Sequence, residues 1–288
     1  FIIPDIQKKV IINPNNSGTS NELLNLDVKT SGTTEQLNAI AFGNGVFVVV
    51  GNYGTTLISS DNGATWSSTY TGNTSHLNSI AYGNGTFAAV GNSGSILIST
   101  DNGSNWTSKS SGTGSTLNSI IYADKKFISV GSNGTIISSS DSGRTWTSKS
   151  SGTSTNFHGI THGLNLFVVS GENKTVFTSS DGDSWTQRSY GSNNLLSATY
   201  GNNTFVTVGT SGTILPSPDG TTWTARSSGT FNSLNSVTFG NNLFVAVGSS
   251  GDIVTSSDGS SWTAYTSDGV FYDVTTNTDN FNYIKSCL

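Results

Sequence analysis

The sequence predicts an all-β fold, a seven-bladed β-propeller built from four-stranded antiparallel blades. Three observations predict it: a motif that recurs every 38 to 40 residues, short β-rich runs between the motifs, and turns rich in glycine and asparagine. The motif is Ser-x-Asp-x-Gly-x-x-Trp or a form one residue shorter, and it occurs six times. A fixed period near 40 residues is typical of solenoids and propellers, in which each repeat is one supersecondary unit.

One repeat, residues 77–116, shows why each blade should have four strands. Gly- and Asn-rich turns divide it into short runs that suit an antiparallel meander. We expect strands at residues 77–82, 86–91, 95–99 and 106–109. The first three runs are apolar on both faces, which a sheet with one face in water would not need. Stacking such sheets face to face around an axis buries both faces and gives a propeller.

The repeated motif itself predicts a structural turn. Its aspartate can accept hydrogen bonds from backbone N–H groups just ahead of it, and its glycine permits a left-handed step. Its tryptophan ring can fold onto the hairpin, where burial contributes several kcal/mol (about 25 cal/mol per Å² over roughly 150–250 Å²). We therefore expect structural roles for Asp61, Trp66, Asp101, Trp106, Asp141, Trp146, Asp181, Trp185, Asp219, Trp223, Asp258 and Trp262.

The two ends of the chain are expected to close the ring as one domain, residues 1–288. The innermost-strand pattern occurs seven times, but the chain ends after two strands of the seventh unit. Residues 1–34 would supply its outer strands, at Lys8–Ile12 and Leu23–Lys29, and residues 270–288 its inner strands. Residues 35–269 would form the six blades that carry the motif.

Composition excludes several classes of protein. Only 10% of the residues are charged and the net charge is −5, which argues against a nucleic-acid partner. Cys287 is the only cysteine, so no intrachain disulfide can form, and the apolar runs are too short to span a membrane. The start at Phe1, the absence of methionine and the low charge predict a processed, exported monomer that is secreted or held at the cell surface.

The motif and its period resemble the Asp-box, or BNR, repeats of the sialidase-like propeller superfamily. The segments YGNGTFAAVG (82–91) and YGNNTFVTVG (200–209) are similar to repeats of photosystem II assembly-factor-like and uncharacterised exported propellers. The resemblance implies the fold. It leaves the function open, because the superfamily includes hydrolases, lectins, sorting receptors and assembly factors.

The sialidase branch of this superfamily does not fit the sequence. Its enzymes use three arginines, a Tyr–Glu pair and an aspartate, introduced by Phe-Arg-Ile-Pro. Here the chain opens Phe1-Ile2-Ile3-Pro4, with isoleucine where the arginine belongs. The only arginines are Arg144 in a motif turn and Arg188 and Arg226 on expected outer strands. Sialidase activity is therefore not expected.

The resemblance places ligands on the face opposite the motif turns, near the axis. Departures from the repeat consensus on that face are the candidate ligand-binding residues: Tyr53, His76, His158, Glu172, Phe231, Tyr272 and Asp273. Their aromatic rings could stack on a ligand, and their polar groups could hydrogen-bond a sugar or a peptide. This favours a non-catalytic recognition or scaffold module that binds a glycan or a protein surface.

Three other interpretations of the same residues stay open. A polysaccharide hydrolase or lyase would use Glu172, Glu35 or Asp273 as paired carboxylates, or with His158 or His76 as acid and base. An assembly or adhesion factor would use one broad protein-binding face without a defined pocket. The departures could also be ordinary loop substitutions. No metal-ligand spacing occurs, so neither a metal nor a cofactor is expected.

Overall fold

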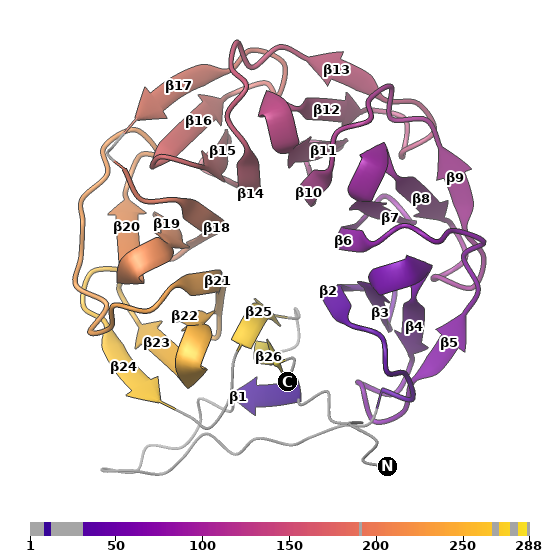
Figure 1. The fold of residues 1–288 in the computed structure, drawn as a ribbon, viewed down its shortest axis with the longest axis horizontal. Helices are drawn as coiled ribbons and strands as arrows, with labels where there is room; N and C mark the ends of the chain where they lie inside the picture. The colour runs from indigo at the N-terminus through magenta and orange to yellow at the C-terminus, as the bar shows by residue number, and fades with distance from the viewer. Residues whose placement is uncertain (1–8, 13–30, 190–191, 267–270, 277–281, 287–288) are drawn as a thin grey trace.

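The computed structural model describes residues 9–12, 31–189, 192–266, 271–276 and 282–286, which form a ring of antiparallel sheets around a central opening (Figure 1). The prediction of an all-β propeller is confirmed. Within the described residues every element is either a strand or a one-turn 3-10 helix. No helix in this part of the chain is long and apolar enough to cross a membrane.

The six motif-bearing repeats each form one blade, numbered here from 1 to 6 along the chain. Blades 1 to 3 consist of β2 (Leu37–Gly43), β3 (Val46–Gly51), β4 (Thr56–Ser59) and β5 (Ser67–Thr69); β6 (Leu77–Gly83), β7 (Thr86–Gly91), β8 (Ile96–Ser99) and β9 (Thr107–Lys109); β10 (Leu117–Ala123), β11 (Lys126–Gly131), β12 (Ile136–Ser139) and β13 (Thr147–Lys149). Blades 4 to 6 consist of β14 (Phe157–Gly163), β15 (Leu166–Gly171), β16 (Thr175–Ser179) and β17 (Thr186–Ser189); β18 (Leu195–Gly201), β19 (Thr204–Gly209) and β20 (Thr213–Ser217); β21 (Leu234–Gly240), β22 (Leu243–Gly248), β23 (Asp252–Ser256) and β24 (Thr263–Thr266).

The hydrophobic core lies between neighbouring blades, as strands that are apolar on both faces require. One cluster joins Val48 and Val50 of blade 1 to Leu77 and Phe87 of blade 2, and Trp106 packs against it. Similar clusters fill the next interfaces around the ring. Because each blade buries both faces against its neighbours, stability depends on the whole ring rather than on any single blade.

Blade 5 departs from the expected four strands. Its sheet contains β18, β19 and β20, and the fourth strand is reduced to a single bridge between Ile214 and Arg226. The reason is Pro216, which has no N–H to donate to the outer strand. Thr224 N still donates to Pro216 O at 3.1 Å, and the reciprocal bond is lost.

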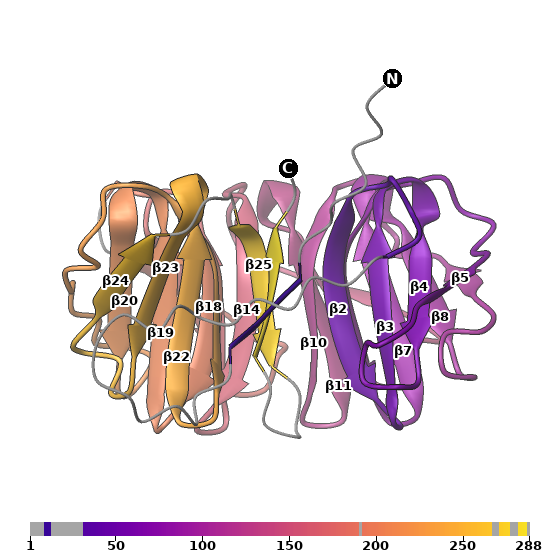
Figure 2. The ribbon, with the colours of Figure 1, turned by 90° about the horizontal axis from the view of Figure 1, so that it is seen from below.

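The ring has two faces with different turns. On the first, here called the η face, lie the one-turn helices η1 (Asn52–Gly54), η2 (Asn92–Gly94), η3 (Ser132–Gly134), η4 (Thr210–Gly212) and η5 (Ser249–Gly251), along the upper edge in Figure 2. The crossings between blades share this face, as the bond from Gly54 N to Ser75 O shows. On the opposite face, here called the Asp face, Asn44 Nδ2 donates to Asn102 Oδ1 in the motif turn of the next blade.

The two ends of the chain meet in a further sheet, ordered β1 (Lys9–Ile12), β26 (Asn282–Ser286) and β25 (Phe271–Thr276). Val10 pairs with Ile284 in an antiparallel register. β25 lies beside both β21 of blade 6 and β2 of blade 1, which places the sheet in the gap between these blades (Figure 1). The outer strand expected at residues 23–29 lies outside the described residues.

Candidate functional site

A β-bulge lies at the second residue of the inner strand in each of the six blades. The pairing register shifts at this residue, for example between Leu37 and Ala39, and β25 shows the same shift. Such a bulge adds a residue that has no direct cross-strand partner and can redirect its side chain. The bulge residues are Asn38, Asn78, Asn118, His158, Leu196, Asn235 and Tyr272.

At three of these positions, Asn38, Asn78 and Asn118, the side-chain amide of the bulge residue joins its own blade to the next one. Asn38 Nδ2 donates to Leu77 O, 39 residues further along the chain, at 2.9 Å and to Asn52 Oδ1 at 3.0 Å. Asn118 Nδ2 donates in the same way to Phe157 O at 2.7 Å. These amides form an interblade belt near the central opening.

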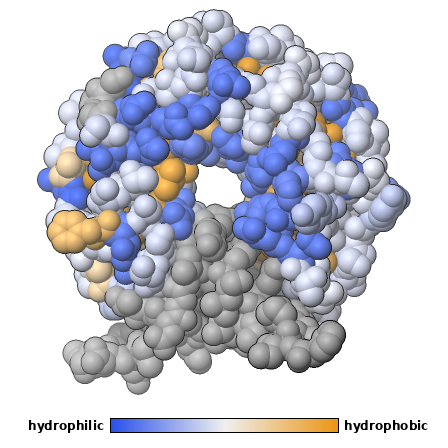
Figure 3. Space-filling view, in the orientation of Figure 1, coloured by the Kyte–Doolittle hydropathy of each residue, from blue (hydrophilic) through white to orange (hydrophobic). Residues whose placement is uncertain are grey.

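A shallow depression of about 480 Å³ opens on the η face beside this belt, where blades 1 and 2 meet. Its walls are made almost entirely of side-chain amides, and no charged residue lines it: Gln36, Asn38, Asn52, His76, Asn78 and Asn92. Figure 3 shows the hydrophilic surface gathered around the central opening on this face.

The asparagine amides of this depression use only some of their donors and acceptors within the protein. The Nδ2 groups of Asn38 and Asn78 donate the interblade hydrogen bonds, and the Oδ1 atoms of Asn52 and Asn92 accept from the same two amides. Within the described residues, the other half of each of these four amides has no partner. The depression therefore presents both donors and acceptors to a ligand.

Tyr53 and His76, both predicted site residues, contact each other beside this depression, and His76 is part of its lining. Their ring centroids are 4.7 Å apart and the rings are tilted by 52°. The Tyr53 side chain is 62% exposed, and its backbone has the left-handed angles φ 53° and ψ 34°. His76 Nδ1 is buried and has no hydrogen-bond partner among the described residues.

His158 and Glu172 form a second pair in blade 4. Burial lowers the pKa of His158, and the Glu172 carboxylate partly opposes this effect, so the imidazole is neutral near pH 7. Asn156 Nδ2 donates to Glu172 Oε1 at 3.0 Å. His158 Nε2 is buried without a partner in the part of the chain that the structure describes.

The remaining predicted residues are not brought into either pair. Phe231 is 93% exposed on the crossing from blade 5 to blade 6, next to Asn232, whose carbonyl accepts from Gly212 N of η4. Tyr272 and Asp273 lie on β25, but their side chains are outside the described residues. Glu35, the other candidate acid, precedes β2, and its N–H donates to Thr33 Oγ1.

The carboxylates of the motif aspartates accept their hydrogen bonds from groups within their own turns. Asp141 Oδ1 accepts from Thr145 N at 2.9 Å and from Ser139 Oγ at 2.8 Å, and Oδ2 accepts from Thr145 Oγ1 at 2.7 Å. The bonds from Thr145 are the main reason why the pKa of Asp141 falls from 3.8 to about 2. The ring N–H of Trp146 donates to Gly143 O and closes the same turn.

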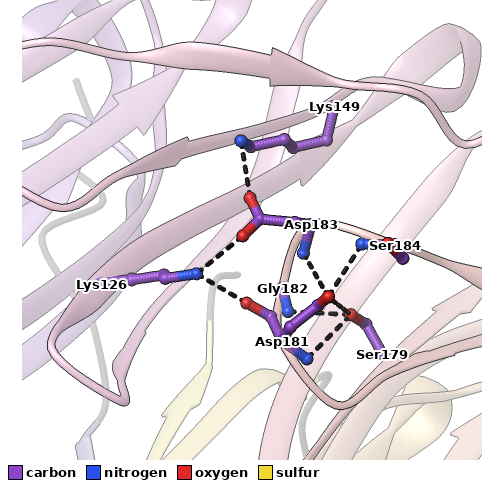
Figure 4. A network of polar contacts seen from close by, with 7 residues as sticks. All are labelled: Lys126, Lys149, Ser179, Asp181, Gly182, Asp183 and Ser184. Atoms are coloured by element: carbon purple, nitrogen blue, oxygen red, sulfur yellow. Dashed lines mark hydrogen bonds and ion pairs between the residues drawn. The ribbon is translucent and has the colours of Figure 1, made fainter.

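A charged cluster on the Asp face was not foreseen from the sequence. Lys126 of blade 3 and Lys149 of blade 3 both bind Asp183 in the motif turn of blade 4, at 3.0 and 2.6 Å (Figure 4). Lys126 Nζ also donates to Asp181 O at 2.6 Å. The sequence feature that could have indicated this cluster is Lys126, which stands at a position where the other repeats have valine, threonine or leucine.

The fold and its repeated motif turns define a β-propeller of the BNR type, whose η face is polar around the central opening. The chain belongs to the family described as "Photosynthesis system II assembly factor YCF48", whose model matches residues 6–239. No curated protein matches the sequence.

Solved structures agree with this fold. One titled "YCF48 bound to D1 peptide" has a TM-score of 0.76 at 16% identity and covers 96% of this chain and 94% of its own. YCF48 from Cyanidioschyzon merolae has a TM-score of 0.71 at 15% identity, covering 88% of this chain and 94% of its own. The WD40 β-propeller domain of Doa1 has a TM-score of 0.67 at 15% identity, with the same coverage. At such low identity these likenesses show the fold alone.

The family corrects the predicted location. We expected a secreted or cell-surface protein, from the low charge and the start of the chain. This prediction is wrong, because the family is described as a photosystem II assembly factor, and photosystem assembly takes place inside the cell. The low charge and the many hydroxyl and amide side chains come from the polar turns of the repeats. They therefore do not indicate in which compartment the protein works.

Proposed function

We propose that this protein is a non-catalytic, monomeric scaffold that binds an extended polypeptide segment on its η face. The observation that carries the proposal is the depression at blades 1 and 2, where four asparagine amides keep unused donors and acceptors. The family supports it, because its description is that of an assembly factor. A similar propeller has been solved with a peptide bound, which supports the same kind of ligand here.

The chemistry of the depression suits a polypeptide main chain. A peptide group offers one N–H donor and one C=O acceptor, and a primary amide can satisfy both at once. Each such bond contributes only about 0.5–1.5 kcal/mol net, so several must act together along an extended segment. The lining has no charge, so charge pairing within the depression would add little to affinity.

A displayed random dodecapeptide library, selected against the full chain, tests the proposal. The blocking variant is Gln36→Trp, which fills the depression without removing any side-chain hydrogen bond of Gln36 within the described residues. The matched control is Ser104→Trp, an exposed position in a motif turn on the Asp face.

We expect peptides enriched on the native chain to bind the Ser104→Trp variant equally well and the Gln36→Trp variant at least about tenfold more weakly. Equal binding to both variants would place the site elsewhere. If the native chain selects no peptide but binds a sugar on a glycan array run in parallel, the ligand is a glycan, because the same amides can also hydrogen-bond sugar hydroxyl groups.

We further infer that the sheet β1–β26–β25 is a seventh blade that closes a single-domain ring. Its position beside both β21 and β2 supports this, as does the antiparallel pairing of Val10 with Ile284. A disulfide between V10C and I284C, in a chain carrying Cys287→Ser, should form readily and raise the thermal midpoint. If the two cysteines do not cross-link under oxidising conditions, the ring does not close in this way.

A further inference from the structure

We propose that Tyr53 and His76 form a subsite for one uncharged aromatic side chain of the bound segment. This deepens the proposed function and rests on it, because the subsite is placed at the rim of the peptide-binding depression.

Tyr53 occupies a backbone position that suits small polar residues. The equivalent residues of the other described turns also have left-handed angles, with φ between 54° and 59°, and each is serine or asparagine: Ser93, Asn133, Asn173, Ser211 and Ser250. Asparagine tolerates this conformation, whereas a bulky side chain is strained in it. The other blades form this turn without a bulky side chain, so the turn itself does not require a tyrosine, and strain of this kind is found at functional sites.

His76 likewise lacks the structural role of its counterparts. In two other blades the equivalent residue is an asparagine that accepts a hydrogen bond from the preceding left-handed turn. Asn133 N donates to Asn156 Oδ1 at 2.9 Å, and Asn173 N donates to Asn194 Oδ1 at 3.1 Å. His76 Nδ1 accepts no such bond from the described residues. Both Tyr53 and His76 therefore differ in residue type from their counterparts in the other blades, and both lie at the same turn.

The geometry of the pair indicates what it would hold. The two rings are tilted against each other, and most of the Tyr53 ring remains exposed beside a depression whose wall includes His76. A third ring can pack edge-to-face or offset against such a pair. Because no charged residue lines the depression, a charged side chain would lose hydration there without gaining a counter-ion. An aromatic, uncharged side chain fits both conditions.

Two small probes test the subsite directly: N-acetylphenylalanine methylamide and N-acetylalanine methylamide. Each has the same pair of peptide groups, and they differ only in the ring. Both are titrated into the ¹⁵N-labelled full chain while the side-chain amide signals of Asn38 and Asn78 are followed by NMR. The variants are Tyr53→Ser and His76→Asn, which introduce the residue types that other blades already accommodate. Phe231→Ser is the matched control, since it removes a more exposed aromatic ring from another crossing.

We expect the native chain and the Phe231→Ser variant to bind the phenylalanine probe about tenfold more tightly than the alanine probe. In Tyr53→Ser and His76→Asn the preference should disappear, while the alanine probe still shifts the Asn38 and Asn78 signals. Equal affinity of the native chain for both probes would overturn the aromatic subsite and leave the peptide-binding depression intact. A preference that survives Tyr53→Ser would also overturn it. If neither probe shifts these signals and the peptide library selects nothing, both proposals fail.

Discussion

The side-chain amide of Asn78 donates to the backbone carbonyl of Leu117 at 3.0 Å, although the two residues lie 39 positions apart and in different blades. The same amide also donates to Asn92 Oδ1 in its own blade. One asparagine therefore fixes both the start of η2 in its own blade and the start of the next inner strand. Blade alignment and the shape of the depression depend on the same group.

Replacing this asparagine should destabilise the ring. Asn78→Leu leaves a partly buried carbonyl and an amide oxygen without a donor, which costs about 1–3 kcal/mol. Urea unfolding followed by tryptophan fluorescence would measure the loss. A change of less than about 0.5 kcal/mol, the size typical of surface substitutions, would show that the belt does not contribute.

The opposite effect is expected at His158, which occupies the equivalent position in blade 4. His158→Asn removes a buried nitrogen that has no partner among the described residues and restores an amide like that of Asn118. We expect a gain of about 0.5–1.5 kcal/mol from one added hydrogen bond. The same urea titration measures it, and a loss of stability would mean that the imidazole makes a contact that asparagine cannot replace.

The motif aspartates should make the protein sensitive to strong acid. Asp141 and Asp181 have pKa values lowered from 3.8 to about 2, chiefly by the N–H groups of Thr145 and Ser184, and the other four motif aspartates shift in the same direction. A depressed carboxyl pKa contributes stability that is fully present above about pH 4 and is lost as the pH falls towards 2. Thermal midpoints followed by circular dichroism should fall steeply in this window.

An Asp141→Asn variant separates this effect from general acid damage. It should melt at a lower temperature than the native chain at pH 7, because the amide accepts more weakly than the carboxylate. Its midpoint should then fall less between pH 4 and pH 2. If the thermal midpoints of both proteins fall by the same amount between pH 4 and pH 2, protonation of Asp141 does not contribute to the loss of stability in acid.

Blade 5 should gain an outer strand when its proline is removed. Pro216→Val supplies the N–H that the pairing with Thr224 lacks, and valine favours strands. We expect slower hydrogen exchange at the amides of Thr224 and Arg226, measured by mass spectrometry on peptides. Unchanged exchange would indicate that residues other than Pro216 keep the outer strand from pairing.

The charged cluster on the Asp face should contribute modestly and depend on salt. Asp183→Asn removes the partner of both Lys126 and Lys149, and such partly exposed pairs contribute about 0.2–1 kcal/mol each. The difference in unfolding free energy between native and variant chains should shrink from 0.05 M to 1 M NaCl. A difference that is independent of salt would point to packing rather than charge.

The sequence by itself determined the repeat, the all-β class, most strand positions and the turns. These features depend on local properties: the alternation of residue types, the glycines and asparagines that accept left-handed angles, and the aspartate that bonds to its own turn. Pro216 also carried a local signal, since a proline cannot donate within a sheet. The candidate residues Tyr53, His76, His158 and Glu172 could be selected because each departs from the repeat.

Only the tertiary structure decided which of these residues meet. Tyr53 contacts His76 across a blade crossing, and Glu172 lies near His158, but the two pairs are in different blades and do not form one site. The bonds from Asn38 to Leu77 and from Lys126 to Asp183 join residues 39 and 57 positions apart. Such partners depend on how neighbouring blades pack and twist around the axis. No local pattern encodes that packing, because it is set by the buried faces of the whole ring.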